Sequence, residues 1–208
     1  MLKSSPTVRI GWLIGLALVI FASLLAVWMP AWSQAAKTDA AAAQQNRQPL
    51  PPAQIRYGTD GLPQAVLDLR DVMQGAIEAG RIEELLHAYQ EAEIKPDIGA
   101  PPKADPVAHW KSVSGDGQGR DVLAALSLIL DTGYAVVRRG ADIENNKTYV
   151  WPYFAEMPLD KLTPRQEVEL LRLVPASTMR EMKAKGKYTH WRLVIGADGT
   201  WQALRKGE

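Results

Sequence analysis

The run of residues from Ile10 to Ala36 constrains this chain most, because it carries no charged side chain and suits no part of a soluble protein surface. Lys3 and Arg9 precede it. As a helix, residues 10–28 would be roughly 28 Å long, close to the hydrocarbon thickness of a bilayer. Basic residues before such a helix stay on the cytoplasmic side. The sequence therefore predicts an N-terminal apolar helix that places the rest of the chain outside the cytoplasm.

Two interpretations of residues 1–36 stay open. As a signal peptide, the segment ends its helix at Pro30, and the small residues Ser33 and Ala35 offer a cleavage site after Ala35. As a signal anchor, residues 10–28 remain in the membrane, and their length, greater than that of a usual signal-peptide core, favours this. In either case we expect a periplasmic or otherwise extracytoplasmic protein, which contacts the membrane if the segment is uncleaved.

The residue types exclude several classes of chemistry. The chain contains no cysteine, so it forms no disulfide, carries no lipidated cysteine, and uses neither a thiol nucleophile nor a cysteine-based zinc site. Without Lys3 and Arg9, it carries 22 basic and 23 acidic residues. This balance gives no reason to expect nucleic acid as a partner.

The chain after the apolar run divides into a linker and a single domain. Residues 37–54 are rich in alanine, glutamine and proline, have little apolar surface to bury, and predict a flexible linker. Residues 55–208 have the size of one domain with one core. Apolar periodicity, proline starts and glycine stops predict helices over residues 62–79, 82–93, 120–130, 163–174 and 177–185.

Alternating and aromatic stretches predict two β-hairpins. The first joins Tyr134–Arg139 to Lys147–Phe154, and the second joins Tyr188–Ile195 to Thr200–Leu204 through a Gly-Ala-Asp-Gly turn. Strands that are adjacent in sequence pair antiparallel. The sequence thus predicts an α+β fold, with helices packed on a small antiparallel sheet of about four strands and preceded by the N-terminal apolar helix.

The aromatic residues of the predicted strands supply candidate ligand-binding side chains. Tyr149, Trp151 and Tyr153 share one face of a strand by alternation. Such a face is either a stacking platform for a glycan or peptide, or core beneath the helices. If Trp191 is core, His190 and Arg192 point to the opposite side of their strand and line the open face of the sheet.

A glycine-rich loop before the third predicted helix is a candidate anion site. Gly115, Gly117 and Gly119 free backbone N–H groups near a helix N-terminus, and Arg120 adds a positive charge. The loop matches neither the phosphate-loop nor the dinucleotide consensus. The alternative is a plain connector capped by Ser114 or Asp116.

No motif identifies a catalytic residue, a metal site or a cofactor. We therefore expect an exported or membrane-tethered envelope protein that acts without catalysis, as a binding or accessory module for an envelope protein or glycan. The alternative is a small envelope hydrolase with its site near the Gly115–Arg120 loop and His190. Convergence of His109, His190 and a carboxylate in one cleft would favour the hydrolase.

Overall fold

The computed structural model describes residues 53–138 and 146–207, all of which fall in the unit Leu50–Glu208. The predicted N-terminal helix, with either a cleavage site or an anchor, and almost all of the predicted linker lie outside the described residues. Across residues 53–138 and 146–207, no helix combines the length and apolar character needed to cross a membrane.

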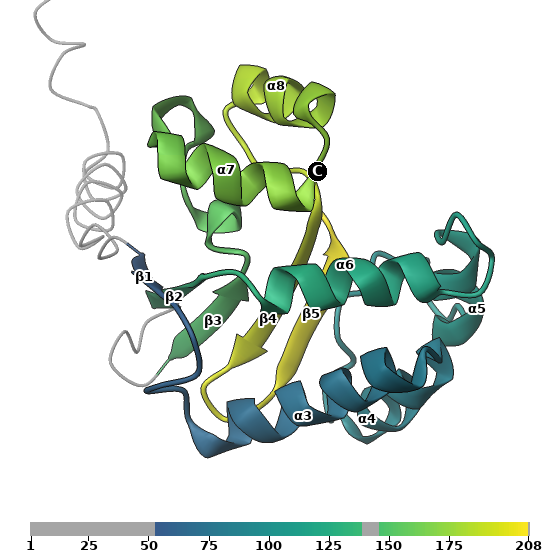
Figure 1. Cartoon of the computed structure of the whole chain (residues 1–208). Coiled ribbons are helices and arrows are strands. Elements are labelled where there is room, and N and C mark those ends of the chain that lie inside the picture. The colour runs from purple at the N-terminus through teal and green to yellow at the C-terminus, as the bar shows by residue number, and fades with distance from the viewer. Residues whose placement is uncertain (1–52, 139–145, 208) are drawn as a thin grey trace, which may run out of the picture. The chain divides into compact units, whose positions relative to one another are not determined.

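The described residues form the predicted α+β fold, with helices packed on an open antiparallel sheet. The strand order in space follows the order along the chain (Figure 1). The strands are β1 (Gln54–Arg56), β2 (Tyr134–Arg138), β3 (Lys147–Trp151), β4 (Trp191–Gly196) and β5 (Trp201–Lys206). Both predicted hairpins are present, as the β2–β3 and β4–β5 pairs.

The sheet has five strands, so the prediction of about four is corrected by one. β1 pairs antiparallel with β2, and Gln54 lies opposite Val136. Three residues are too few to show an alternating pattern, and their partner strand lies far away in the sequence. Gln54, the last residue of the predicted linker, therefore belongs to the sheet.

The first hairpin also ends earlier than predicted. β3 stops at Trp151, a cis peptide bond joins Trp151 to Pro152, and residues Tyr153–Glu156 form a short 3₁₀ helix. Proline has no N–H to donate to a sheet, so a strand running on to Phe154 would have lost its ladder at Pro152.

The helices agree with the predicted segments, with one addition. They are α3 (Gln64–Ala79), α4 (Leu85–Glu91), α5 (Pro106–Ser112), α6 (Arg120–Leu130), α7 (Pro164–Leu173) and α8 (Ala176–Lys185). Helix α5 was not predicted, because it is short and follows a proline-rich loop. Asp105 starts it by accepting the Ala108 N–H at 2.6 Å. A capping box between Thr163 and Gln166 starts α7.

Helix α6 is central to the packing. It lies against both β4 and α3 (Figure 1), and its side chains Leu126 and Ile129 are buried. Helix α7 contacts α6 as well. This arrangement brings one side of α6 next to the first residue of β4, Trp191, where the candidate site lies.

Candidate functional site

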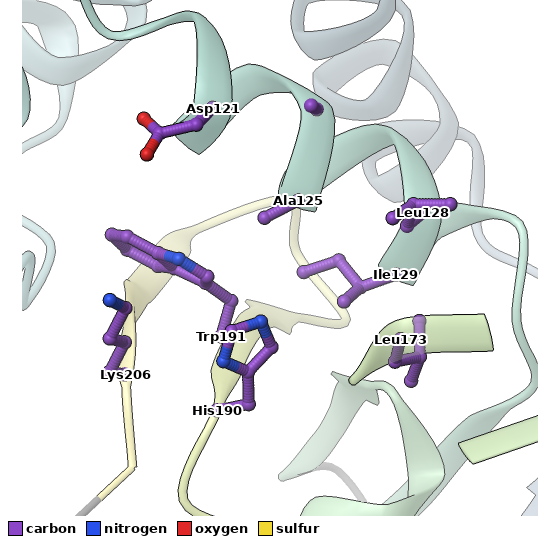
Figure 2. A pocket seen from close by; sticks show the side chains of 9 residues that line it. Asp121, Ala125, Leu128, Ile129, Leu173, His190, Trp191 and Lys206 are labelled. Atoms are coloured by element: carbon purple, nitrogen blue, oxygen red, sulfur yellow. The ribbon is translucent and has the colours of Figure 1, made fainter. Parts of the chain in front are cut away.

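A cleft of about 270 Å³ opens between α6 and the ends of β4 and β5 (Figure 2). We call it the Trp191 cleft. Its lining residues come from α6, from the end of α7, from the start of β4 and from the end of β5: Asp121, Ala124, Ala125, Leu128, Ile129, Leu173, His190, Trp191 and Lys206.

One wall of the Trp191 cleft is apolar. It consists of small and aliphatic side chains of α6 together with Leu173. Leu128 is 40 % exposed, although the rest of the apolar face of α6 is buried in the core. The wall therefore presents apolar surface that an apolar group of a ligand would cover favourably.

Lys206 and His190 form a basic end of the cleft. The Lys206 Nζ lies 5.5 Å from the centroid of the Trp191 ring, a cation–π arrangement. Among the described residues, Lys206 makes no ion pair with a carboxylate. Burial, reinforced by the neighbouring Lys206, lowers the pKa of His190 below its usual 6.5, so this imidazole is neutral at pH 7.

Asp121 lies on α6 on the other side of the Trp191 ring, away from His190 (Figure 2). Its carboxylate accepts the Gly115 N–H at 2.6 Å and the Ser114 hydroxyl. Burial acts to raise the pKa of Asp121, but these two hydrogen bonds outweigh it, and the pKa lies below its usual value. Asp121 is therefore an ionised side chain whose main partners belong to the preceding loop.

The glycine-rich loop bonds its backbone N–H groups to its own side chains. The N–H of Gln118 and that of Arg120 both reach Asp116, at 3.0 and 3.3 Å. The N–H of Gly119 reaches the Ser114 hydroxyl at 3.0 Å. These bonds match the connector interpretation, with both Ser114 and Asp116 as caps. They also occupy the donors that an anion at Gly115, Gly117, Gly119 and Arg120 would need.

Gly119 is required where this loop meets the core. Its φ is +83°, and a Cβ built there would lie 2.6 Å from the Ile82 Cβ. A side chain would thus meet both backbone strain and a clash with a buried residue. Glycine at this position therefore allows the loop to pack closely against Ile82.

The predicted aromatic face is core. Tyr149, Trp151 and Tyr153 are 5 %, 1 % and 0 % exposed, so their rings do not form an open platform. The prediction that all three share a strand face is wrong for Tyr153, because β3 ends at Trp151. The Tyr153 hydroxyl instead donates to Glu169 on α7 at 2.7 Å.

His190 and Arg192 differ in their surroundings. His190 precedes the first residue of β4, so strand alternation does not reach it, and it lines the same cleft as Trp191. The prediction placed His190 with Arg192 on the face opposite Trp191, and for His190 strand alternation gives no support for that placement, because it lies outside β4. Arg192 lies opposite Arg205 in the β4–β5 register and does not line the Trp191 cleft.

The histidines do not form a catalytic arrangement with an acid. His109 lines a separate depression of about 200 Å³ that shares Trp191 and Lys206 with the Trp191 cleft, and its Nε2 donates to the Ile98 carbonyl at 3.0 Å. His87 pairs with Glu91 on the surface of α4. Within residues 53–138 and 146–207, no group of three or more His, Asp or Glu side chains is placed to hold a metal ion.

Comparisons with protein-family models, with curated proteins and with solved structures find no significant match to this chain. The assignment of the site therefore depends on its own geometry.

Sequence reasoning identified His190 but missed Lys206 and the wall of α6. Lys206 is one of many lysines, and nothing in its local sequence marks it. A weak signal was available in α6, which is apolar nearly all round: a helix of that kind in a small domain leaves some apolar surface near its edges.

Proposed function

We propose that the protein is a binding module that acts outside the cytoplasm and takes an envelope partner in the Trp191 cleft. The observation that supports this best is the pairing of an apolar wall with Lys206, a cation that makes no ion pair with the described residues. Binding sites combine apolar surface with a few polar groups that fix the orientation of the ligand. The location outside the cytoplasm follows from the apolar run at residues 10–36, either as a cleaved signal or as an anchor.

The partner that we propose is an envelope protein or a glycan. Either one would cover Leu128 and the Trp191 edge of the cleft, and neither requires a cofactor or metal ion. This proposal moves the ligand site from the aromatic strand face to the start of β4, because the rings of Tyr149 and Trp151 are already covered by protein.

A hydrolase is the second candidate, and one observation favours it: His190 and Asp121 line the same cleft. A neutral imidazole is able to accept a proton. However, Asp121 is held by Ser114 and Gly115, and no hydrogen bond links it to His190 among the described residues. Purified protein incubated with envelope glycan and peptide fragments tests this candidate: turnover that disappears in His190→Gln would replace the binding function by a hydrolytic one.

Photo-crosslinking in living cells tests the binding function. The crosslinking amino acid p-benzoylphenylalanine replaces Leu128 in the cleft, and in a control it replaces Val168, which is 63 % exposed on α7 and lines no part of the cleft. We expect an adduct of defined mass at position 128 and none at position 168. Adducts of equal yield at both positions, or none at position 128, would contradict the proposal.

A further inference from the structure

We infer that the Trp191 cleft binds the carboxyl terminus of a partner polypeptide whose last side chain is apolar. This inference rests on the proposed binding function and names the chemistry of its ligand. Capture of a terminal carboxylate is a recurrent mode of peptide recognition, because one end group supplies both charge and position.

The charges in the cleft select an anionic group at one end. Lys206 on β5 supplies a full positive charge beside Trp191, and no described carboxylate neutralises it. His190 adds an imidazole on the same side, whereas Asp121 places a negative charge at the α6 side. A ligand carboxylate therefore fits against Lys206 and His190 and is repelled from Asp121.

The apolar wall determines which kind of side chain the residue with that carboxylate should carry. Ala125, Leu128 and Leu173 lie across from the basic end, and Leu128 is partly exposed. The volume of about 270 Å³ lies below the range of about 300–1,000 Å³ that is typical of sites for drug-sized ligands. A single apolar side chain together with its terminal carboxylate matches that size.

The second depression favours a polypeptide over a free fatty acid. It has a volume of about 200 Å³, begins at Trp191 and Lys206, and extends to Ile98, His109 and Val113. A peptide that places its carboxylate at Lys206 has preceding residues to lay along this depression. A fatty acid has one chain and leaves one of the two depressions empty.

The negative charge of Asp121 determines which last residues of a partner the cleft should disfavour. A partner whose last residue is aspartate or glutamate would bring a second negative charge toward α6. We therefore expect leucine, valine or phenylalanine at the last position and discrimination against acidic residues.

Calorimetry on the purified full-length chain in detergent tests the inference with two five-residue peptides. They are identical and end in leucine, one with a free carboxylate and the other with a carboxamide. We expect the free acid to bind about tenfold more tightly, because the amide loses the charge-assisted contact. Lys206→Ala should remove that difference in affinity, because it should weaken binding of the free-acid peptide and leave binding of the amide unchanged. Lys161→Ala, at an exposed lysine that does not line the cleft, should leave it unchanged.

A pH series provides a readout that a purely structural role of Lys206 would not produce. The titratable groups beside His190 are Lys206 and Tyr188, whose pKa is raised by burial so that it stays neutral, and Asp121 lines the cleft on the other side of the Trp191 ring. Protonation of His190 adds a positive charge beside the ligand carboxylate, so affinity for the free acid should rise as the pH falls below 6.5 and through the lowered pKa of His190. Affinity for the amide should stay flat, and His190→Gln should abolish the rise.

Three results would overturn the inference. These are equal affinities of the acid and the amide, an undiminished acid affinity in Lys206→Ala, or binding of octanoate as tight as that of the peptide acid, which would indicate a lipid carboxylate. If no peptide binds but the adduct at position 128 still forms, the ligand class is wrong and the binding function stands. If neither occurs, the binding function itself fails.

Discussion

Two clusters of polar side chains in this domain differ in whether their charged groups have hydrogen-bond or ion-pair partners. The first, which we call the Glu169 cluster, consists of Tyr57, Tyr153, Arg165 and Glu169. The Glu169 carboxylate accepts the hydroxyls of Tyr57 and Tyr153 at 3.1 and 2.7 Å and the Arg165 Nε–H at 3.2 Å. The second is the basic end of the Trp191 cleft, where Lys206 rests on an aromatic ring without a described carboxylate partner.

This difference in partners distinguishes a cluster that stabilises the fold from a cluster that is available to bind a ligand. In the Glu169 cluster, each of the two tyrosine hydroxyls has an acceptor, the carboxylate is 16 % exposed, and the cluster ties the chain just after β1 to α7. A network whose members satisfy one another around the buried Tyr153 hydroxyl stabilises a fold. An unpaired cation at an open apolar cleft adds little to stability and remains available to a ligand.

The largest effect is expected for Glu169→Ala. This change removes the acceptor of the Tyr153 hydroxyl, whose residue is 0 % exposed, and of the Tyr57 hydroxyl as well. We expect the free energy of unfolding in urea to fall by about 2–3 kcal/mol, because a buried donor is left without a partner. The control is Glu167→Ala, which breaks the ion pair of a more exposed acidic side chain (36 % against 16 % for Glu169) with Lys183 and should cost about 0.5 kcal/mol. Equal losses in the two variants would show that the cluster is not structural.

A smaller effect of the same cluster should appear on acidification. Burial acts to raise the pKa of Glu169, but hydrogen bonds from Tyr153, Tyr57 and Arg165 outweigh it and lower the pKa below the usual 4.5. A lowered pKa in the folded state means that the unfolded state binds protons first as the pH falls. The contribution of Glu169 is therefore complete above pH 4.5 and is lost as the pH falls through the folded-state pKa. Urea midpoints measured from pH 6 to pH 3 should fall less in Glu169→Gln than in the wild type, and the loss that remains belongs to other carboxylates with a lowered pKa, such as Asp121 and Asp198.

The smallest effect on stability is expected for Lys206→Ala. Lys206 is exposed and contributes a cation–π contact to Trp191. We expect a change within about 0.5 kcal/mol in the free energy of unfolding. A loss as large as that of Glu169→Ala would place Lys206 among the structural residues and remove the contrast between the two regions.

The parts of the fold that sequence predicted are those with a local signal. The β4–β5 hairpin has alternation on both strands and a glycine turn, and α7 has a capping box with proline at its start. β1 has three residues, and its identity as a strand depends on pairing with Val136 and its neighbours, which no local pattern can reveal. Helix α5 was hidden by the prolines before it, although Asp105 and Pro106 are a helix start.

The candidate site was less predictable than the fold. Its aromatic candidates were chosen from alternation, which does not tell core from surface, and Tyr149 and Trp151 proved to be core. The placement of His190 depended on alternation in a strand predicted from Tyr188, whereas β4 begins at Trp191, three residues later. Lys206 reaches the cleft because β5 runs beside β4 and α6 packs across them, a consequence of tertiary packing that single-sequence patterns do not carry.

Amide chemical-shift mapping tests the central claim most directly. The ¹⁵N-labelled protein is titrated with the leucine-ended peptide acid, and signals of the Trp191 cleft are compared with those of the Glu169 cluster. We expect saturable shifts at His190, Trp191, Leu128 and Lys206, with those of Tyr57 and Glu169 unchanged. Shifts centred on the Glu169 cluster, or no saturable shifts at the cleft, would contradict this claim.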